Sequence, residues 1–497
     1  MALQSGPPAR GMAWSGIMVL VAAGLAGGYL MPGGKNDAAA GKPEKCENCA
    51  PADPYADLPP CCRATALEAD AQKKREFALT DADRKETAEA PSLAFDGEGR
   101  LFAVWASQTG ENEKTLFLAT SLGGGATFDP PRAIRKSGIF STTFEAKGKT
   151  VKRTAKMSPH LVATADKLIV SWSEAAADNS TVHLLQMESD NGGLSFSEPV
   201  RVNKADDARP TYTGFTSGGN GMLAASWLDR RSGVQLPALA VRAAGASEYA
   251  EEIAIPAGDE GKGICPCCPT ATVIADDGTV YVAFRNQLAG KRDMFLAKWS
   301  AASDLEGPFP VVEPTWEFDG CPHDGPSLAV DSQTLHLVWM DAHTGPQRVY
   351  YGKANRGDLK FEVQPLHAAG PGTQGNAAIC LTKTGDLHAV WEESAKEPAP
   401  TEGAKAETGK HDHGAAVGGG RRIMHTVARK GGAFETPHVV LLRDEDRFQT
   451  RPAMAAAENG KVVIAFQELD ENGKRVVIGP SWLPPELAEP SISAVSK

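Results

Sequence analysis

The sequence predicts an all-β fold, a β-propeller of seven blades, with six blades as the alternative. A unit of two apolar strands joined by a Gly- or Asp-containing turn recurs along residues 91–466. Each unit closes on a Trp or Phe, and these residues recur about every 55 positions, a period typical of propellers built from short strands. The abundance of Gly (51) and Pro (34) among 497 residues also favours many turns over long helices.

The seven units share a common start, which is a Pro in all but one, and a closing aromatic residue. They run from Pro91 to Trp105, Pro159 to Trp172, Pro210 to Trp227, Pro269 to Phe284, Pro326 to Trp339, Asn376 to Trp391 and Pro452 to Phe466. A third and a fourth strand are expected after each unit, but no clear fourth strand follows the last. Residues 75–80 (REFALT) are predicted to supply that outer strand and close the ring, which removes an unpaired sheet edge.

The propeller is predicted to span residues 75–485, with a low-complexity insertion at 394–421 and a tail at 486–497. Residues 36–74 form a linker rich in Ala, Pro and charged residues, without a periodic apolar face. Within residues 1–35, the uncharged apolar run 12–31 has about the 20 residues that a membrane helix needs. It is either an anchor that tethers the protein to the membrane or a cleaved signal. Both imply export, to the periplasm or the cell surface.

Composition narrows the class of protein further. The chain is 42% hydrophobic and contains 17 Phe, 9 Trp and 7 Tyr, so a sizeable core is expected rather than a disordered chain. The formal net charge of −11 argues against nucleic acid as the main partner.

Eight of the nine cysteines fall into two groups, and the first group, Cys46, Cys49, Cys61 and Cys62, lies in the linker. In an exported protein, four cysteines this close together indicate two disulfides. A thiolate site for copper or zinc is the alternative, although the adjacent pair does not match a zinc-finger spacing.

The second group lies where the innermost strands of two neighbouring blades begin. Cys265, Cys267 and Cys268 precede the innermost strand of the fourth blade, whereas Cys321 and His323 precede that of the fifth. Because adjacent blades place these two segments side by side near the axis, we expect one cluster at the channel mouth.

Three interpretations of this second group stay open. They are two disulfides that staple adjacent blades, a soft-metal site that includes His323 or Met157, and a redox-active pair. The ninth cysteine, Cys380, lies in an apolar inner strand and is expected to be an inert core thiol.

Several arginines are predicted to gather on the same rim of the propeller, because they lie in loops that lead into inner strands or join second to third strands. The predicted ligand-binding residues are Arg209, Arg230, Arg285, Arg292, Asp324 and Arg451. Guanidinium groups match carboxylates and phosphates bidentately, which predicts an anion-binding mouth. The alternative is that these arginines are solvated or paired with neighbouring carboxylates.

The insertion at 394–421 contains a further candidate metal site. His411 and His413 flank an Asp and can bind Cu(II) or Zn, whereas the alternative is a solvated loop.

Two turns between third and fourth strands, at 121–128 (SLGGGATF) and 189–196 (SDNGGLSF), resemble the Asp-box (BNR) repeats of the sialidase superfamily. A narrower resemblance, to bacterial exported proteins labelled exo-α-sialidase-like, is carried by ICPCCP at 264–269 and GCP at 320–322. The resemblance implies a sialidase-like propeller, in which Asp-boxes are structural. The superfamily's Arg-Ile-Pro motif is absent, so its catalytic set cannot be assembled from this sequence.

These observations predict an exported, noncatalytic or noncanonical sialidase-like propeller that binds a glycan or a protein partner at its Cys- and Arg-rich face. One alternative is an exo-acting glycosidase of sialidase type on an acidic sugar. The other is an envelope protein that handles a soft metal, copper or zinc.

Overall fold

The computed structural model describes residues 77–79, 88–89, 91–146, 149–154, 158–313, 315–318, 320–394, 420–441, 448–470 and 473–482. Within these ranges the chain forms strands and turns and no helix, which confirms the predicted all-β class. Accordingly, none of the described segments is a helix long and apolar enough to cross a membrane. The predicted anchor or signal at 12–31 lies outside these ranges.

Five sheets consist of four antiparallel strands each, taken in chain order from the first to the fourth. The first two sheets are β2 (Ser92–Phe95), β3 (Leu101–Gln108), β4 (Glu113–Ser121) and β5 (Arg132–Gly138), then β8 (His160–Ala163), β9 (Leu168–Ala175), β10 (Val182–Ser189) and β11 (Val200–Arg201). The third is β12 (Thr211–Ser217), β13 (Leu223–Asp229), β14 (Leu236–Arg242) and β15 (Ile253–Ala254). The fourth and fifth are β16 (Ala271–Ile274), β17 (Val280–Arg285), β18 (Met294–Ser300) and β19 (Asp304–Pro310), then β20 (Ser327–Val330), β21 (Thr334–Asp341), β22 (Arg348–Asn355) and β23 (Glu362–Pro365).

The remaining strands form one larger sheet and one hairpin. The sheet contains β24 (Gln374–Leu381), β25 (Leu387–Ser394), β26 (Arg421–Ala428), β27 (His438–Val439), β28 (Phe448–Ala456), β29 (Val462–Asp470), β30 (Gly473–Ile478) and β1 (Phe77–Ala78). A single parallel pairing, Arg421 with Phe448, joins its two antiparallel halves. Because this pairing merges two of the expected blades, the count of seven blades stays a prediction. The hairpin of β6 (Ser141–Ala146) and β7 (Lys149–Thr154) was not predicted, and it accounts for the long interval between the first two units.

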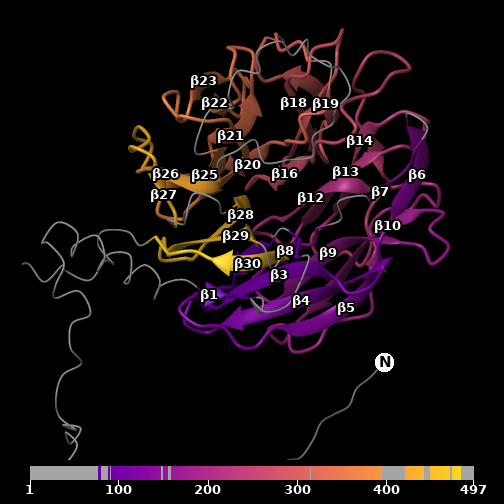
Figure 1. Cartoon of the computed structure of the whole chain (residues 1–497), viewed down its shortest axis with the longest axis vertical. Coiled ribbons are helices and arrows are strands. Elements are labelled where there is room, and N and C mark those ends of the chain that lie inside the picture. Colours follow the sequence, from indigo (N-terminus) through magenta and orange to yellow (C-terminus); the bar gives the residue numbers. More distant parts are fainter. Residues whose placement is uncertain are drawn as a thin grey trace, which may run out of the picture. The chain divides into compact units, whose positions relative to one another are not determined.

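The first strands of successive sheets contact one another in a closed ring. β2 contacts β8, and the contacts continue through β12, β16, β20 and β24 to β28, which contacts β2 again. Figure 1 shows the sheets following one another in chain order around this ring. A closed ring of antiparallel sheets joined through their first strands is a β-propeller.

The ring is closed by the start of the described chain, as the sequence predicts. β1 pairs antiparallel with β30, with Phe77 opposite Ile478 and Ala78 opposite Val477. Leu79 continues this pairing, because its N–H donates to the carbonyl of Val476 over 2.9 Å. The Leu79 side chain is buried in the core between the last and first sheets.

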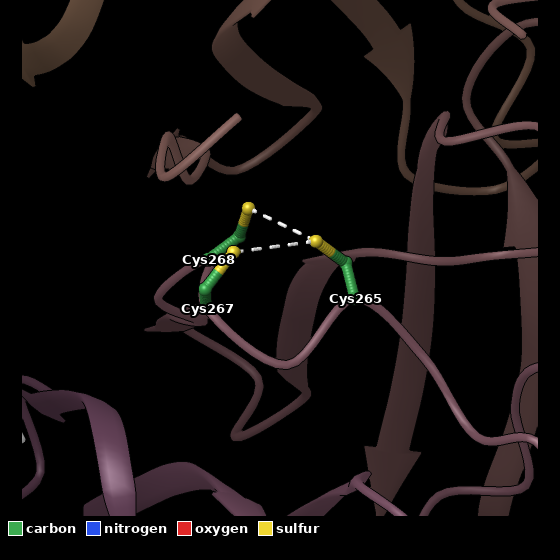
Figure 2. A group of neighbouring side chains, drawn as sticks. All are labelled: Cys265, Cys267 and Cys268. Carbon is green, nitrogen blue, oxygen red and sulfur yellow. Dashed lines mark hydrogen bonds between the residues drawn. The ribbon is translucent and has the colours of Figure 1, made fainter. Parts of the chain in front are cut away.

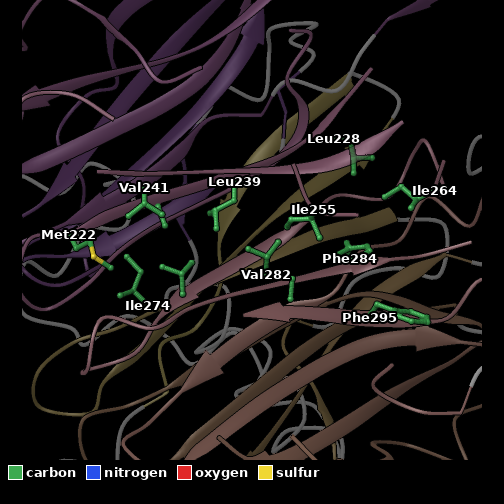
Figure 3. Close-up of a cluster of buried hydrophobic side chains, with 13 residues drawn as sticks. Met222, Leu228, Leu239, Val241, Ile255, Ile264, Ile274, Val282, Phe284 and Phe295 are labelled. Carbon is green, nitrogen blue, oxygen red and sulfur yellow. The ribbon is translucent and has the colours of Figure 1, made fainter. Parts of the chain in front are cut away.

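Apolar side chains of the second and third strands fill the space between neighbouring sheets. The closing aromatic residues of the repeat units, among them Trp172, Trp227 and Trp339, are fully buried. Figure 3 shows the cluster between the third and fourth sheets, in which Leu239 and Val241 of β14 face Val282 and Phe284 of β17.

The second Asp-box turn is capped by side-chain oxygens. The Ser189 hydroxyl accepts the Gly193 N–H at 2.8 Å, and the Asn191 amide oxygen accepts the Ser195 N–H at 3.0 Å. Gly193 has a φ of 79°. A Cβ added at this position would lie 2.7 Å from a Leu118 methyl group, so the turn requires glycine.

Leu79→Ala is expected to lower the free energy of unfolding by about 2–5 kcal/mol, because it removes a buried side chain from the closing contact. Urea denaturation followed by tryptophan fluorescence measures this change. Leu194→Ala is the matched control, since Leu194 is 75% exposed and its loss should change stability by less than about 0.5 kcal/mol. Equal effects of the two substitutions would show that the first segment does not close the ring.

Candidate functional site

The loop that carries three of the cysteines leads from β15 to β16, and we call residues 264–270 the CxCC loop. Ile264, at its start, is buried in the core between the third and fourth sheets. The Ile264 N–H donates to the Gln235 carbonyl at 2.9 Å. Gly263 has a φ of 72°, and a Cβ there would lie 2.5 Å from that same carbonyl oxygen. Glycine at this position therefore lets the chain turn closely against the β13–β14 connection.

The three sulfur atoms of this loop face one another inside the protein (Figure 2). The Cys265 Sγ lies 3.6 Å from the Cys267 Sγ and 3.5 Å from the Cys268 Sγ. All three side chains are buried, and Cys321 from the loop before β20 packs against them. A disulfide needs sulfurs about 2.05 Å apart, whereas sulfurs held tetrahedrally at about 2.3 Å from one ion lie roughly 3.8 Å apart. The observed spacing excludes a disulfide within this loop in the structure, and it is one at which the sulfurs could hold a metal ion together.

The possible ligand atoms form two overlapping groups. Cys265, Cys267 and Cys268 make an inner triad, and Cys267, Cys321 and His323 make an outer triad. In each triad the three ligand atoms lie within 4.8 Å of one another. The inner triad is fully buried, whereas Cys321 and His323 are half-buried. The two loops predicted to meet at the channel mouth thus do meet, and Cys267 belongs to both groups.

The surroundings of the cluster favour a thiolate at one position. Hydrogen bonds from the neighbouring thiols of Cys267, Cys268 and Cys321 lower the pKa of Cys265, and the nearby Arg292 charge acts in the same direction. Burial raises the pKa of Cys268. Of the four clustered cysteines, Cys265 is the one whose pKa is lowered, so it is the one that the surroundings favour as a thiolate.

Arg285, predicted to bind a ligand, binds the protein's own backbone instead. It is 1% exposed, and its guanidinium donates to the carbonyls of Arg292 at 2.9 Å, Asp324 at 3.2 Å and Met340 at 2.7 Å. The guanidinium also lies over the Trp316 ring, 5.1 Å from its centroid. Arg285 on β17 therefore ties the fourth sheet to the segment that carries Cys321 and to β21.

Arg292 and Asp324 flank the cluster and keep unused polar atoms. The Arg292 Nε donates to the Phe318 carbonyl at 2.8 Å, while its buried Nη1 has no hydrogen-bond partner among the described residues. Asp324 accepts the Asn376 N–H with one carboxylate oxygen, and the other is buried without such a partner in the described chain. Burial raises the pKa of Asp324 to about 6, against the opposing effect of Arg285.

The other three predicted arginines have no hydrogen bond or ion pair with the cysteine cluster within the described ranges. Arg209 is exposed, donates to the Ser180 carbonyl at 3.2 Å and lies over the Phe140 ring. Arg230 is exposed. Arg451 is half-buried, and its N–H donates to Glu392 at 2.7 Å.

Tyr212 is a neighbour of the cluster that the sequence did not assign to it. It packs against the buried cysteines, and its carbonyl accepts the Thr270 N–H at 3.0 Å, which holds the end of the CxCC loop. Its φ is 53°, at a bulge between β12 and β13. Asn376 and Arg451 also have positive φ at bulges in their strands, and His323 has a φ of 55° just before β20. Strained backbone of this kind gathers at functional sites.

Acidic residues follow several core tryptophans at a spacing of two positions, a pattern that is present in the sequence. The indole N–H of Trp227 donates to Asp229 at 2.9 Å, and that of Trp172 donates to Glu174 at 3.1 Å. Asp229 also accepts from Arg231, an ion pair that removes this arginine from any free anion site. The repeated Trp–acid contact is therefore structural.

A ladder of three imidazoles crosses the sheet that contains β25, β26 and β27. The His388 Nδ1 lies 2.9 Å from the His425 Nε2, and the His425 Nδ1 lies 3.3 Å from the His438 Nε2. His388 is fully buried and meets the Trp482 ring edge-on at 4.4 Å between centroids. Burial lowers the pKa of His388 to about 4.

The remaining predicted sites lie outside the described residues. They are Cys46, Cys49, Cys61 and Cys62 of the linker, Met157, and His411 and His413 of the insertion. Cys380 is on β24 opposite His388, and burial raises the pKa of its thiol to about 12, in keeping with an unreactive cysteine.

No known protein-family model matches this chain, and no curated protein matches it. Solved structures similar to it include a protein of unknown function from Dyadobacter fermentans DSM 18053, with 11% identity, 82% of this chain and 98% of that chain covered, and a TM-score of 0.45. The Hadza microbial sialidase Hz136 has 13% identity over 64% of this chain and 66% of that chain, with a TM-score of 0.43. The β-propeller domain of the Trilobed protease from Pyrococcus furiosus has 10% identity, 80% and 96% coverage, and a TM-score of 0.42.

The class of fold is a β-propeller, on the strength of the closed ring of sheets described above. At these identities the similarity assigns no activity to this chain.

Arg285→Lys is expected to lower the free energy of unfolding by about 1–3 kcal/mol, because a lysine ammonium cannot reach three carbonyls and leaves buried acceptors unpaired. Arg230→Lys, at an exposed position, is the control and should change stability by less than about 0.5 kcal/mol. Urea denaturation of both variants measures the difference. A stable Arg285→Lys variant would mean that the guanidinium does not join the two sheets.

The His388 pKa predicts an acid-sensitive fold. The group is neutral in the folded protein down to about pH 4 but charged in the unfolded chain below about pH 6.5, so acid favours unfolding over this window. Between pH 7 and pH 4 the wild type should lose up to about 3 kcal/mol more stability than His388→Gln. Denaturation curves at several pH values test this, and parallel pH profiles would contradict it.

Proposed function

We propose that this chain is an exported β-propeller that holds a soft metal ion, copper(I) or zinc, at Cys265, Cys267, Cys268, Cys321 and His323. One observation carries this proposal: three buried sulfurs of the CxCC loop lie close together, with Cys265 at 3.6 Å from Cys267 and 3.5 Å from Cys268, and the ligand atoms of Cys321 and His323 from the neighbouring loop lie within 4.8 Å of the Cys267 sulfur. Thiolate and imidazole are the ligands that copper(I) and zinc prefer.

The charges around the cluster support a metal–thiolate group over neutral disulfides. Neighbouring thiols lower the pKa of Cys265, and Arg292 acts in the same direction. The pKa of Cys321 is raised by its contact with Cys265 and that of Cys268 by burial, and the charges of Arg292 and Arg285, respectively, oppose these rises. Thiolates around a metal ion carry a net negative charge, which these buried guanidinium groups offset. A disulfide would leave the same pocket without that negative charge.

The residues around the cluster have separate roles in this proposal. The backbone contacts of Ile264 and Thr270 fix the CxCC loop, and Arg285 fixes the position of the segment that follows Cys321. The loops therefore present their sulfurs in place before an ion arrives, which limits the ordering cost of binding. Each thiol releases its proton to solvent as it becomes a ligand.

The binding of a glycan or a protein partner at this face stays a prediction, and its anion-binding form is weakened by the structure. Arg285 donates to three carbonyls, and the exposed Arg209 donates to the Ser180 carbonyl and lies over the Phe140 ring. For the same reason no observation favours the glycosidase alternative over the metal site. Export and membrane tethering are expected from the apolar run at residues 12–31, and the proposal includes them on that basis.

Metal analysis of the full chain tests the proposed function. The parent protein carries Cys46→Ser, Cys49→Ser, Cys61→Ser and Cys62→Ser, so that the linker contributes no thiolate. After anaerobic loading with copper(I) or zinc and gel filtration, at least one equivalent per chain should remain bound.

Two variants of this parent separate a specific site from unspecific binding. Cys265→Ser with Cys267→Ser should lose at least tenfold in metal affinity, whereas Cys380→Ser should retain the parent's affinity. The proposal is wrong if the untreated chain retains no metal and thiol titration under denaturing conditions finds its clustered cysteines joined in disulfides.

A further inference from the structure

We infer that the cluster is a two-ion copper(I) site, in which the Cys267 sulfur bridges an ion in the inner triad and an ion in the outer triad. This inference rests on the proposed soft-metal function. It specifies which metal binds, how many ions bind and which ligands hold each ion.

The two triads give each ion three ligand atoms. The inner triad offers three sulfurs from one loop, and the outer triad offers two sulfurs and one imidazole drawn from both loops. Three sulfurs around an ion at about 2.3 Å lie roughly 4 Å apart, within half an ångström of the spacings from Cys265. A thiolate sulfur has lone pairs enough to bind two ions, and Cys267 is the one sulfur placed in both triads.

Coordination number distinguishes copper(I) from zinc at the inner triad. Structural zinc requires four ligands in a tetrahedron, so an ion held by three sulfurs needs a water molecule or a fourth side chain. Cys265, Cys267 and Cys268 are 0–1% exposed, so the fourth zinc ligand would have to be Cys321, which packs against them and which the two-ion arrangement places in the outer triad. Copper(I) is satisfied by three soft ligands, so each triad can hold its own ion.

Differences in exposure give the two ions different roles. Cys321 and His323 are half-buried, so an ion in the outer triad has a path to solvent. An ion enters the inner triad by way of the outer triad, because the two triads share Cys267. Tyr212 covers the cysteine cluster on the side of β12. The outer ion is therefore the exchangeable one and the inner ion the retained one.

The test is the number of copper ions bound per chain in the parent protein, in which the four linker cysteines are replaced by serine. Anaerobic titration with a copper(I)–acetonitrile complex, in competition with a copper(I) chelator, should reach two equivalents per chain. X-ray absorption of the loaded chain should show copper–copper scattering, a measurement that needs no further variant.

Single substitutions then separate the two ions. Cys268→Ser should leave one equivalent, in the outer triad, and His323→Ala should leave one equivalent, in the inner triad. Cys267→Ser should remove tight binding of both, and Cys380→Ser is the control that keeps two equivalents. Thermal melts of each variant without metal confirm that it is folded.

The outcomes distinguish this inference from the proposed function. One equivalent in the parent, without copper–copper scattering, overturns the two-ion site but leaves a soft-metal propeller. No bound copper and no bound zinc overturn both. Two equivalents that survive Cys267→Ser would show two separate ions and overturn the bridging role.

Discussion

The guanidinium of Arg285 is the interaction on which the cysteine site depends. It is fully buried and bonds three backbone carbonyls, one from its own sheet and two from the chain that follows Cys321. Neighbouring blades of a propeller otherwise meet through apolar contacts, which are nondirectional and fix relative position only loosely. Its directed bonds fix the segment that follows Cys321 against β17, which pairs with the strand after the CxCC loop. The sulfurs of Cys267 and Cys321, from separate loops, lie within 4.8 Å of each other in this arrangement.

The architecture could be read from the sequence because each unit repeats a short, buried pattern. The predicted first and second strands correspond to the observed ones, and the predicted closing strand at residues 75–80 is found as β1. The β6–β7 hairpin was missed because it adds a pair of strands outside the repeat, in a polar stretch with no apolar period. Strand periodicity in a sequence reports alternating apolar residues, so a hairpin with a mostly polar sequence leaves little trace in the pattern.

The candidate site was predictable in position but not in chemistry. Blade register brought Cys265 and Cys321 to one place, whereas the role of Arg285 depended on carbonyls 39 and 55 positions away. Every residue has a backbone carbonyl, so no sequence pattern predicts that a given arginine will donate its hydrogen bonds to the backbone. Likewise, the positive φ of Tyr212 arises from a bulge against β13, and its contact with the cysteines follows from that bend. The bulge and this contact depend on how the strands pair, and residue type alone does not determine that pairing.

Thiolate metal sites in proteins differ in which interactions offset the free-energy cost of ordering the loops that carry the ligands. Small zinc modules fold only when the metal binds, so their affinity is reduced by the cost of folding. In this propeller the loops are held by Ile264, Thr270 and Arg285, whose partners are all protein groups. A metal ion bound to the proposed site would add its binding free energy to a fold that already exists, and it would stabilise the contact between adjacent sheets by mass action. The propeller holds the loops in place, and a metal ion at the cluster would link the fourth sheet to the fifth. The site is therefore better suited to retaining an ion at fixed geometry than to folding around it.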